Sequence, residues 1–107
     1  MGDSPEKAVE ILVAEGVAVI GANCSLTSSE MIGLVGEMRS LTDAPLLFQP
    51  NAGQPELADG NAVYRQDPGE FADDLIKMVK AGANAVGGCC GTTPEFTRAI
   101  RARLDRM

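Results

Sequence analysis

The three cysteines of this chain are its most reactive side chains, and they are placed in a pattern. Cys24 ends the run GANC at 21–24, and Cys89 and Cys90 stand side by side in the run GGCCG at 87–91. Zinc prefers thiolates in a tetrahedral arrangement, and a catalytic zinc keeps its fourth position open for water or substrate. Adjacent ligands need a flexible backbone, which the flanking glycines provide. The pattern predicts one zinc site with Cys24, Cys89 and Cys90 as its ligands.

An internal similarity places these cysteines at equivalent points of two structural units. Residues 14–24 read AEGVAVIGANC and residues 80–90 read KAGANAVGGCC, so that Cys24 matches Cys90 at an offset of 66 residues. Each stretch contains a short apolar segment that is typical of a buried parallel strand. The carboxyl ends of such strands are where catalytic residues gather in α/β barrels and open sheets. We therefore expect both cysteines at the same end of one sheet.

Other interpretations of the cysteines stay open on the pattern alone. In the simplest alternative, the three cysteines are ordinary buried residues of the core, because cysteine is among the most buried residue types. A disulfide between the neighbours Cys89 and Cys90 is sterically strained. Three cysteines also suit an iron–sulfur cluster, which would absorb visible light where zinc would not. A phosphate-binding loop at Gly87 and Gly88 is a further interpretation, but adjacent thiolates would repel an anion.

Helix and strand signals alternate along the chain. The strongest helix starts are Ser4 followed by Pro5, Thr27 with Glu30 as a capping box, and Asp67 followed by Pro68. The predicted order is αβαβαβα, with these ranges: helix 4–16, strand 17–20, a helix opening at 27, strand 46–49, a polar loop to about 66, helix 67–82, strand 84–86 and a helix from 92 or 93. Such an order implies parallel strands joined by right-handed crossovers.

The composition is that of one small globular domain with an aliphatic core. Hydrophobic residues make up 45% of the 107 residues, aromatic residues 4%, and there is no histidine to serve as a base or ligand. The net charge of −6 argues against nucleic acid or a membrane surface as a partner. No apolar run approaches the roughly 20 residues that span a bilayer, and the acidic N-terminus is unlike a signal peptide. Three cysteines, two of them adjacent, are a poor disulfide framework, so we expect a reducing, cytoplasmic location.

Three motifs together carry a family resemblance. GANC at 21–24, QPNAG at 49–53 and GGCCGT at 87–92 resemble motifs of the homocysteine S-methyltransferase family, with the greatest similarity to the homocysteine-binding domain of its cobalamin-dependent methionine synthase branch. The resemblance extends from about residue 8 onward. It implies a zinc-dependent transfer of a methyl group to homocysteine, giving methionine, with the substrate thiol in the fourth zinc position. It also implies methylcobalamin on a separate corrinoid module as donor, although relatives use betaine or S-methylmethionine.

The resemblance implies a (β/α)8 TIM barrel, of which this α/β chain is the C-terminal part. A full barrel needs about 200 or more residues, whereas this chain offers about three βα units plus a leading helix, corresponding to strands six to eight. We therefore expect all of 1–107 to be one portion of a barrel domain, without a second domain. The stretch 26–29 departs from the family, because members commonly carry Gly-Pro there, and this leaves the donor branch open.

Further residues are assigned to substrate binding from their place beside the cysteines. Asn23, Asn51 and Gly88 are the candidates, and Gln49 at a strand end is a weaker one. Because earlier strands of the barrel are missing, the isolated chain is expected to be inactive. Its unpaired strand edges are expected to associate with the remaining N-terminal barrel segment or with a second copy of the chain. The rival function is a non-catalytic zinc or iron–sulfur module.

Overall fold

A three-stranded parallel sheet forms the centre of the computed structural model, which describes residues 4–107. Its strands are β1 (Ile20–Thr27), β2 (Leu46–Asn51) and β5 (Ala85–Val86), in the order β1-β2-β5. β2 lies in the middle of the sheet and pairs in parallel with both β1 and β5, as parallel strands were expected. All carboxyl ends of a parallel sheet meet at one edge, so the ends of β1 and β5 lie beside the end of β2.

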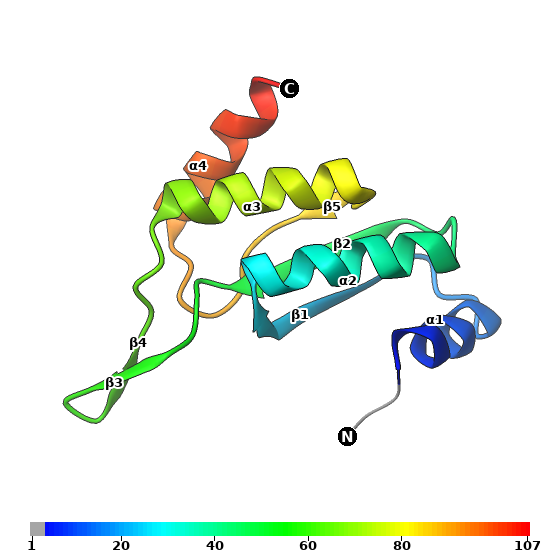
Figure 1. Cartoon of the computed structure of the whole chain (residues 1–107), viewed down its shortest axis with the longest axis horizontal. Helices are drawn as coiled ribbons and strands as arrows, with labels where there is room; N and C mark the ends of the chain where they lie inside the picture. Colours follow the sequence, from blue (N-terminus) through cyan, green and yellow to red (C-terminus); the bar gives the residue numbers. More distant parts are fainter. Residues whose placement is uncertain (1–3) are drawn as a thin grey trace.

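Four helices accompany this sheet: α1 (Pro5–Ala14), α2 (Ser28–Leu41), α3 (Pro68–Ala81) and α4 (Pro94–Asp105). Helices α2 and α3 lie side by side over one face of the sheet, and α4 packs on α3 (Figure 1). The buried side of β2 packs against α2. The largest fully buried apolar side chains of this layer are Phe48, Leu46, Met31, Val35, Phe71, Leu75 and Met78.

The predicted helix starts are confirmed at the level of individual hydrogen bonds. Ser4 accepts from the backbone N–H of Lys7 at 3.2 Å. Thr27 and Glu30 form the reciprocal capping box. Asp67 accepts from two backbone N–H groups of the first turn of α3. Thr93 is the N-cap of α4, but its side chain makes no capping hydrogen bond.

The first strand differs from the prediction in its bounds. It was expected at 17–20, whereas β1 begins at Ile20, and Val17 and Val19 are 40% and 49% exposed. Pairing with β2 decides the start, because Ile20 is the first residue opposite Leu46. At the next position, a Cβ on Gly21 would overlap the Leu47 carbonyl, so only glycine allows the two strands to approach. The strand therefore runs through the GANC motif instead of stopping before it.

The polar loop that was expected up to residue 66 contains an antiparallel hairpin. Its strands are β3 (Glu56–Ala58) and β4 (Asn61–Val63), joined by Asp59 and Gly60, both with positive φ (49° and 79°). An Asp-Gly pair is a strong sequence signal for a two-residue hairpin turn, because both positions of that turn take φ > 0. The hairpin projects from the edge of the molecule, and Leu57 on it is 84% exposed (Figure 1).

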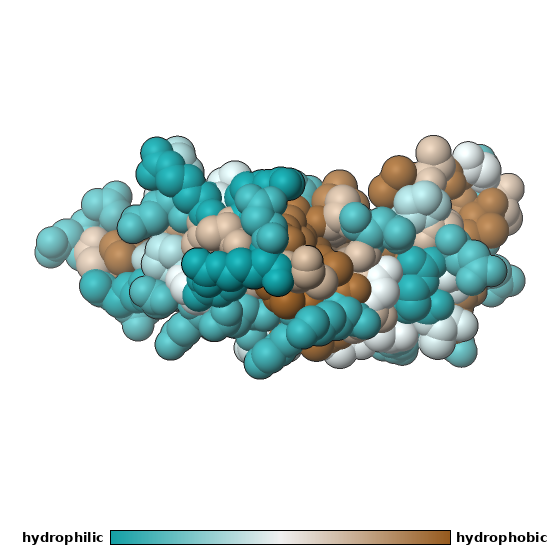
Figure 2. All heavy atoms as spheres, turned by 90° about the horizontal axis from the view of Figure 1, so that it is seen from above, coloured by the Kyte–Doolittle hydropathy of each residue, from teal (hydrophilic) through white to brown (hydrophobic). Residues whose placement is uncertain are grey.

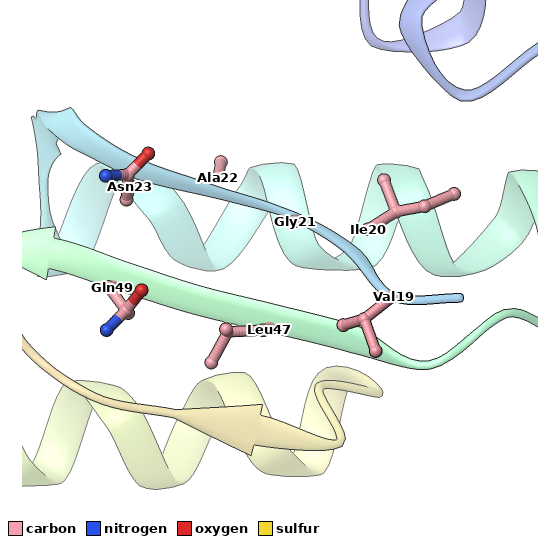
Figure 3. Close-up of a pocket in the computed structure, with 7 residues that line it drawn as sticks. All are labelled: Val19, Ile20, Gly21, Ala22, Asn23, Leu47 and Gln49. Carbon is pink, nitrogen blue, oxygen red and sulfur yellow. The ribbon is translucent and has the colours of Figure 1, made fainter. Parts of the chain in front are cut away.

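The second face of the sheet has no helical layer among residues 4–107. The molecule is a flat slab of 44 × 37 × 19 Å. This open face carries the shallow depression of about 220 Å³ shown in Figure 3, lined mainly by Val19, Gly21, Asn23, Leu47 and Gln49. Val19 beside this depression is 49% exposed, whereas Ile20 is only 3% exposed.

The surface chemistry of the slab is uneven from end to end. Seen from above, hydrophobic surface gathers in the middle and toward the end that holds α1, whereas the hairpin end is mostly hydrophilic (Figure 2). The exposed large hydrophobic residues of α1 and the segment after it are Ile11, Val13, Val17 and Val19. Within residues 4–107, no helix combines the length and the apolar character that crossing a bilayer demands.

Candidate metal centre

The sulfurs of the three cysteines converge at the carboxyl end of the sheet. The Sγ of Cys90 lies 3.9 Å from that of Cys24 and 4.0 Å from that of Cys89. All three sulfurs lie within 4.8 Å of one another. Tetrahedral coordination at the usual zinc–sulfur distance of about 2.3 Å places ligand sulfurs about 3.8 Å apart. Two of the three separations therefore already match those of a tetrahedral thiolate site.

The sulfurs of Cys24 and Cys89 are joined in a disulfide, and Cys90 is the free, exposed thiol. The disulfide thus links β1 to the loop that follows β5. It is not the bond between the neighbours Cys89 and Cys90 that the sequence left open. Its Cα atoms lie 5.8 Å apart. Reduction of this one bond would present three thiols to a common point. This donor set fits zinc, which favours cysteine thiolates.

A bulge in β1 directs Cys24 toward its partners. Asn23 pairs with Gln49 and Thr27 with Asn51, so β1 places three residues where β2 places one. Cys24 and Ser25 take up this excess in the left-handed region, at φ 54° and 57°. Non-glycine residues held in that region store strain and are concentrated at functional sites. The bulge re-aims the end of the strand, as bulges beside active sites commonly do.

The loop that carries the other two cysteines continues the sheet ladder without being a strand. The Cys89 N–H donates to the Pro50 carbonyl at 3.0 Å, and the Ala52 N–H donates to the Cys90 carbonyl at 2.9 Å. The Cys90 N–H donates to Asn51 Oδ1 at 3.2 Å. These bonds fix both cysteines against the end of β2. The loop that carries Cys89 and Cys90 is thus hydrogen-bonded to the end of β2 through its backbone.

The predicted substrate residues Asn51 and Gly88 have structural contacts of their own. Asn51 supports the Cys90 backbone as described. A Cβ on Gly88 would lie 2.6 Å from Thr92 Oγ1, and Thr92 in turn donates to the Cys89 carbonyl at 2.7 Å. Gly88 thus makes room for a side chain that holds the cysteine loop. Their role in substrate binding stays a prediction.

The remaining predicted residue, Asn23, stands on the open face beside the metal centre. Its Nδ2 lies 3.9 Å from Cys24 Sγ. Asn23 and Gln49 project from neighbouring strands at the same level of the sheet (Figure 3). The two amides form the polar end of the depression on that face.

A carboxylate near the bulge is held in its charged form. The backbone N–H of Thr27 donates to Glu30 Oε1 at 2.9 Å and lowers the pKa of that carboxyl group, and the Thr27 hydroxyl adds a second bond at 2.8 Å. The charge lies at the N-terminus of α2, where the helix dipole favours it. This cap fixes the start of α2 directly after the cysteine bulge.

The model of the family described as homocysteine S-methyltransferase matches residues 1–104. The chain belongs to the homocysteine S-methyltransferase family. It is 37% identical over 92 residues to a methionine synthase of Mycobacterium leprae, covering 85% of this chain and 8% of the relative. It is also 37% identical over 111 residues to a selenocysteine Se-methyltransferase of Brassica oleracea var. italica, covering 96% and 31%.

Solved structures of this family have the same fold. The metallated form of the homocysteine methyltransferase MmuM from Escherichia coli superimposes with a TM-score of 0.73 at 29% identity, covering 95% of this chain and 30% of that one. Its oxidized form gives a TM-score of 0.74. The chain thus spans about a third or less of the length of these relatives. The predicted fold class, a part of a TIM barrel, is confirmed.

Proposed function

We propose that residues 1–107 form the zinc-binding, C-terminal portion of one homocysteine-binding barrel domain, which transfers a methyl group to homocysteine to give methionine. The observation that carries the proposal is the convergence of three cysteine sulfurs, two pairs of which are 3.9 and 4.0 Å apart. Family membership supports the reaction class. The remaining strands of the barrel would come from an N-terminal segment or another chain.

Within this proposal Cys24, Cys89 and Cys90 would hold zinc, and the zinc would bind homocysteine through its sulfur. Bound zinc would lower the pKa of the substrate thiol, so that the thiol could lose its proton near neutral pH without a histidine base. The thiolate then forms a bond to the methyl carbon while the bond between that carbon and the donor breaks. The electron pair of the broken bond stays with the donor. The tasks of this chain are to aim the sulfurs and to orient the substrate.

Three residues of this chain would orient either the cysteine loop or the substrate. Asn51 and Gly88 fix the loop of Cys89 and Cys90, while Asn23 faces the open side of the sheet. An amide there can donate to the carboxylate of an amino-acid substrate. The similarity to both a methionine synthase and a selenocysteine Se-methyltransferase leaves the donor open between methylcobalamin on a corrinoid module and a small methylated compound.

Cobalt(II) in place of zinc tests this function by its colour. The reduced chain should bind one equivalent and show sulfur-to-cobalt charge transfer and tetrahedral d–d bands. Homocysteine should strengthen the charge-transfer band, because it adds a fourth thiolate. Cys90→Ser should weaken the band, whereas Thr97→Ala, an exposed change on α4, should leave it unaltered.

Two outcomes would contradict the proposal. A reduced chain that binds no metal would remove the site altogether. A brown protein whose iron content matches its visible absorbance, and which does not respond to homocysteine, would favour the non-catalytic iron–sulfur module instead.

A further inference from the structure

The segment that leaves the hairpin returns to the metal centre and touches the loop of Cys89 and Cys90. Tyr64, directly after β4, is half-buried and packed against the core. A Cβ on Gly91 would lie 2.7 Å from Tyr64 Cδ2 and closer still to other atoms of that side chain. The ring therefore rests on the backbone of Gly91, the residue after Cys90. Gly91 has a φ of 82°, so this contact and this conformation both demand glycine.

Two residues further on, Gln66 touches the other cysteine-bearing segment. Its Nε2 donates to Ser28 Oγ at 3.0 Å, and Ser28 donates to Asp74 Oδ2 at 2.6 Å. Ser28 is fully buried and opens α2, just past the bulge of Cys24. Because the Ser28 proton goes to a carboxylate, its lone pair must accept from an N–H, which fixes the Gln66 amide. The Oε1 of Gln66 is buried and without a partner among residues 4–107.

The residue between them points elsewhere. Tyr64 and Gln66 are half-buried, whereas Arg65 is exposed. Arg65 forms an exposed ion pair with Glu56 of β3. One short segment thus contacts both sides of the candidate site, through Tyr64 at the turn after Cys90 and through Gln66 at the start of α2.

We propose that Tyr64 and Gln66 are positioning residues that hold the loop of Cys89–Cys90 and the bulge of Cys24 at metal-binding separation. The inference rests on the proposed zinc site. Neither side chain is a ligand. Tyr64 presses the Gly91 turn against the end of β2, and Gln66 ties the start of α2 to the same segment through Ser28. Residues that hold metal ligands in place without binding the metal commonly matter for affinity. Their removal weakens metal binding by about 10- to 100-fold.

Zinc competition with a chromophoric chelator, on the reduced chain, measures this directly. Tyr64→Ala and Gln66→Ala should each weaken zinc affinity by about 10-fold or more. Tyr64→Phe keeps the flat ring and should retain the native affinity. Arg65→Ala is the matched control from the same segment and should also retain it. The cobalt(II) spectrum of Tyr64→Ala should show distorted d–d bands, a signature that a uniform loss of stability would not produce.

The outcomes separate the two proposals. If the native chain binds no zinc, the proposed function fails first. If the native chain binds zinc and both alanine variants bind it equally tightly with unaltered cobalt spectra, the positioning role is wrong. Should Tyr64→Ala fail to fold, Tyr64→Leu and Gln66→Ala carry the test, and native affinity in both would equally overturn the inference.

Discussion

The Sγ atoms of Cys24 and Cys90 lie 3.9 Å apart although 66 residues separate them in the chain. They reach each other from two different strands of one parallel sheet, one through a strand bulge and one through a loop bonded to the neighbouring strand. The sheet topology therefore brings Cys24 and Cys90 to the same end of the sheet, and the local backbone sets the distance between their sulfurs.

The first prediction concerns the thiols. The oxidised chain should show one thiol that reacts quickly with an aromatic disulfide reagent, because Cys24 and Cys89 are joined and Cys90 is exposed. The reduced, metal-free chain should show three. Zinc should slow all three reactions, and a strong chelator should restore them. Zinc that protects no thiol would argue against a shared ion.

The second prediction concerns the pairing of β1 with β2. Gly21→Ala should destabilise the chain by about 3 kcal/mol, because its Cβ would overlap the backbone carbonyl of Leu47. Gly33→Ala in α2 is the control, since open space surrounds that position, and it should stabilise by about 0.5–1 kcal/mol. Chemical denaturation measures both, and similar unfolding free energies for the two variants would show that the strands do not approach as described.

The third prediction is a pH dependence of stability from the capping box. The pKa of Glu30 is lowered in the folded chain, chiefly by the Thr27 backbone N–H. The stabilisation is fully present above the ordinary pKa of about 4.3 and is lost as pH falls through the lower folded-state pKa. Glu30→Gln should flatten the acid limb of a stability–pH curve, and Thr27→Ala should cost about 1 kcal/mol near neutral pH. An unchanged acid limb in Glu30→Gln would contradict this.

The fourth prediction concerns association. Within residues 4–107 the outer edges of β1 and β5 have no strand partner, and the second face of the sheet has no helical layer. Unpaired edges invite pairing with another chain. Light scattering at micromolar concentration should therefore show a species larger than a monomer that dissociates on dilution. A monomer that melts cooperatively without metal or partner would show that the edges are harmless.

Much of the fold was predictable because local signals agree with the global topology. Ser4, Thr27 and Asp67 start their helices as expected, and the alternation of helix and strand implies a parallel sheet. The bounds of β1 were not predictable from Val17 to Ile20 alone, because the register with β2 decides them. The hairpin was predictable as well, because Asp59-Gly60 is a typical two-residue hairpin turn.

The cysteines of the candidate site were predictable, whereas their supports were not. Residue type and spacing alone identify the three candidate metal ligands, Cys24, Cys89 and Cys90. Nothing in the type or spacing of Tyr64 and Gln66 points to the cysteines, because their contacts depend on how the hairpin returns to the sheet. Positive φ at Cys24 and Ser25 is likewise a consequence of the bulge and has no signature in the residues themselves.

Zinc K-edge X-ray absorption of the reduced, zinc-loaded chain tests the central claim most directly. The account predicts one zinc per chain with three sulfur neighbours at about 2.3 Å and one lighter oxygen or nitrogen neighbour. Added homocysteine should convert this to four sulfurs, and Cys90→Ser should reduce the protein-derived sulfurs to two. A zinc bound through fewer than three sulfurs in the native chain, or a spectrum that homocysteine leaves unchanged, would contradict it.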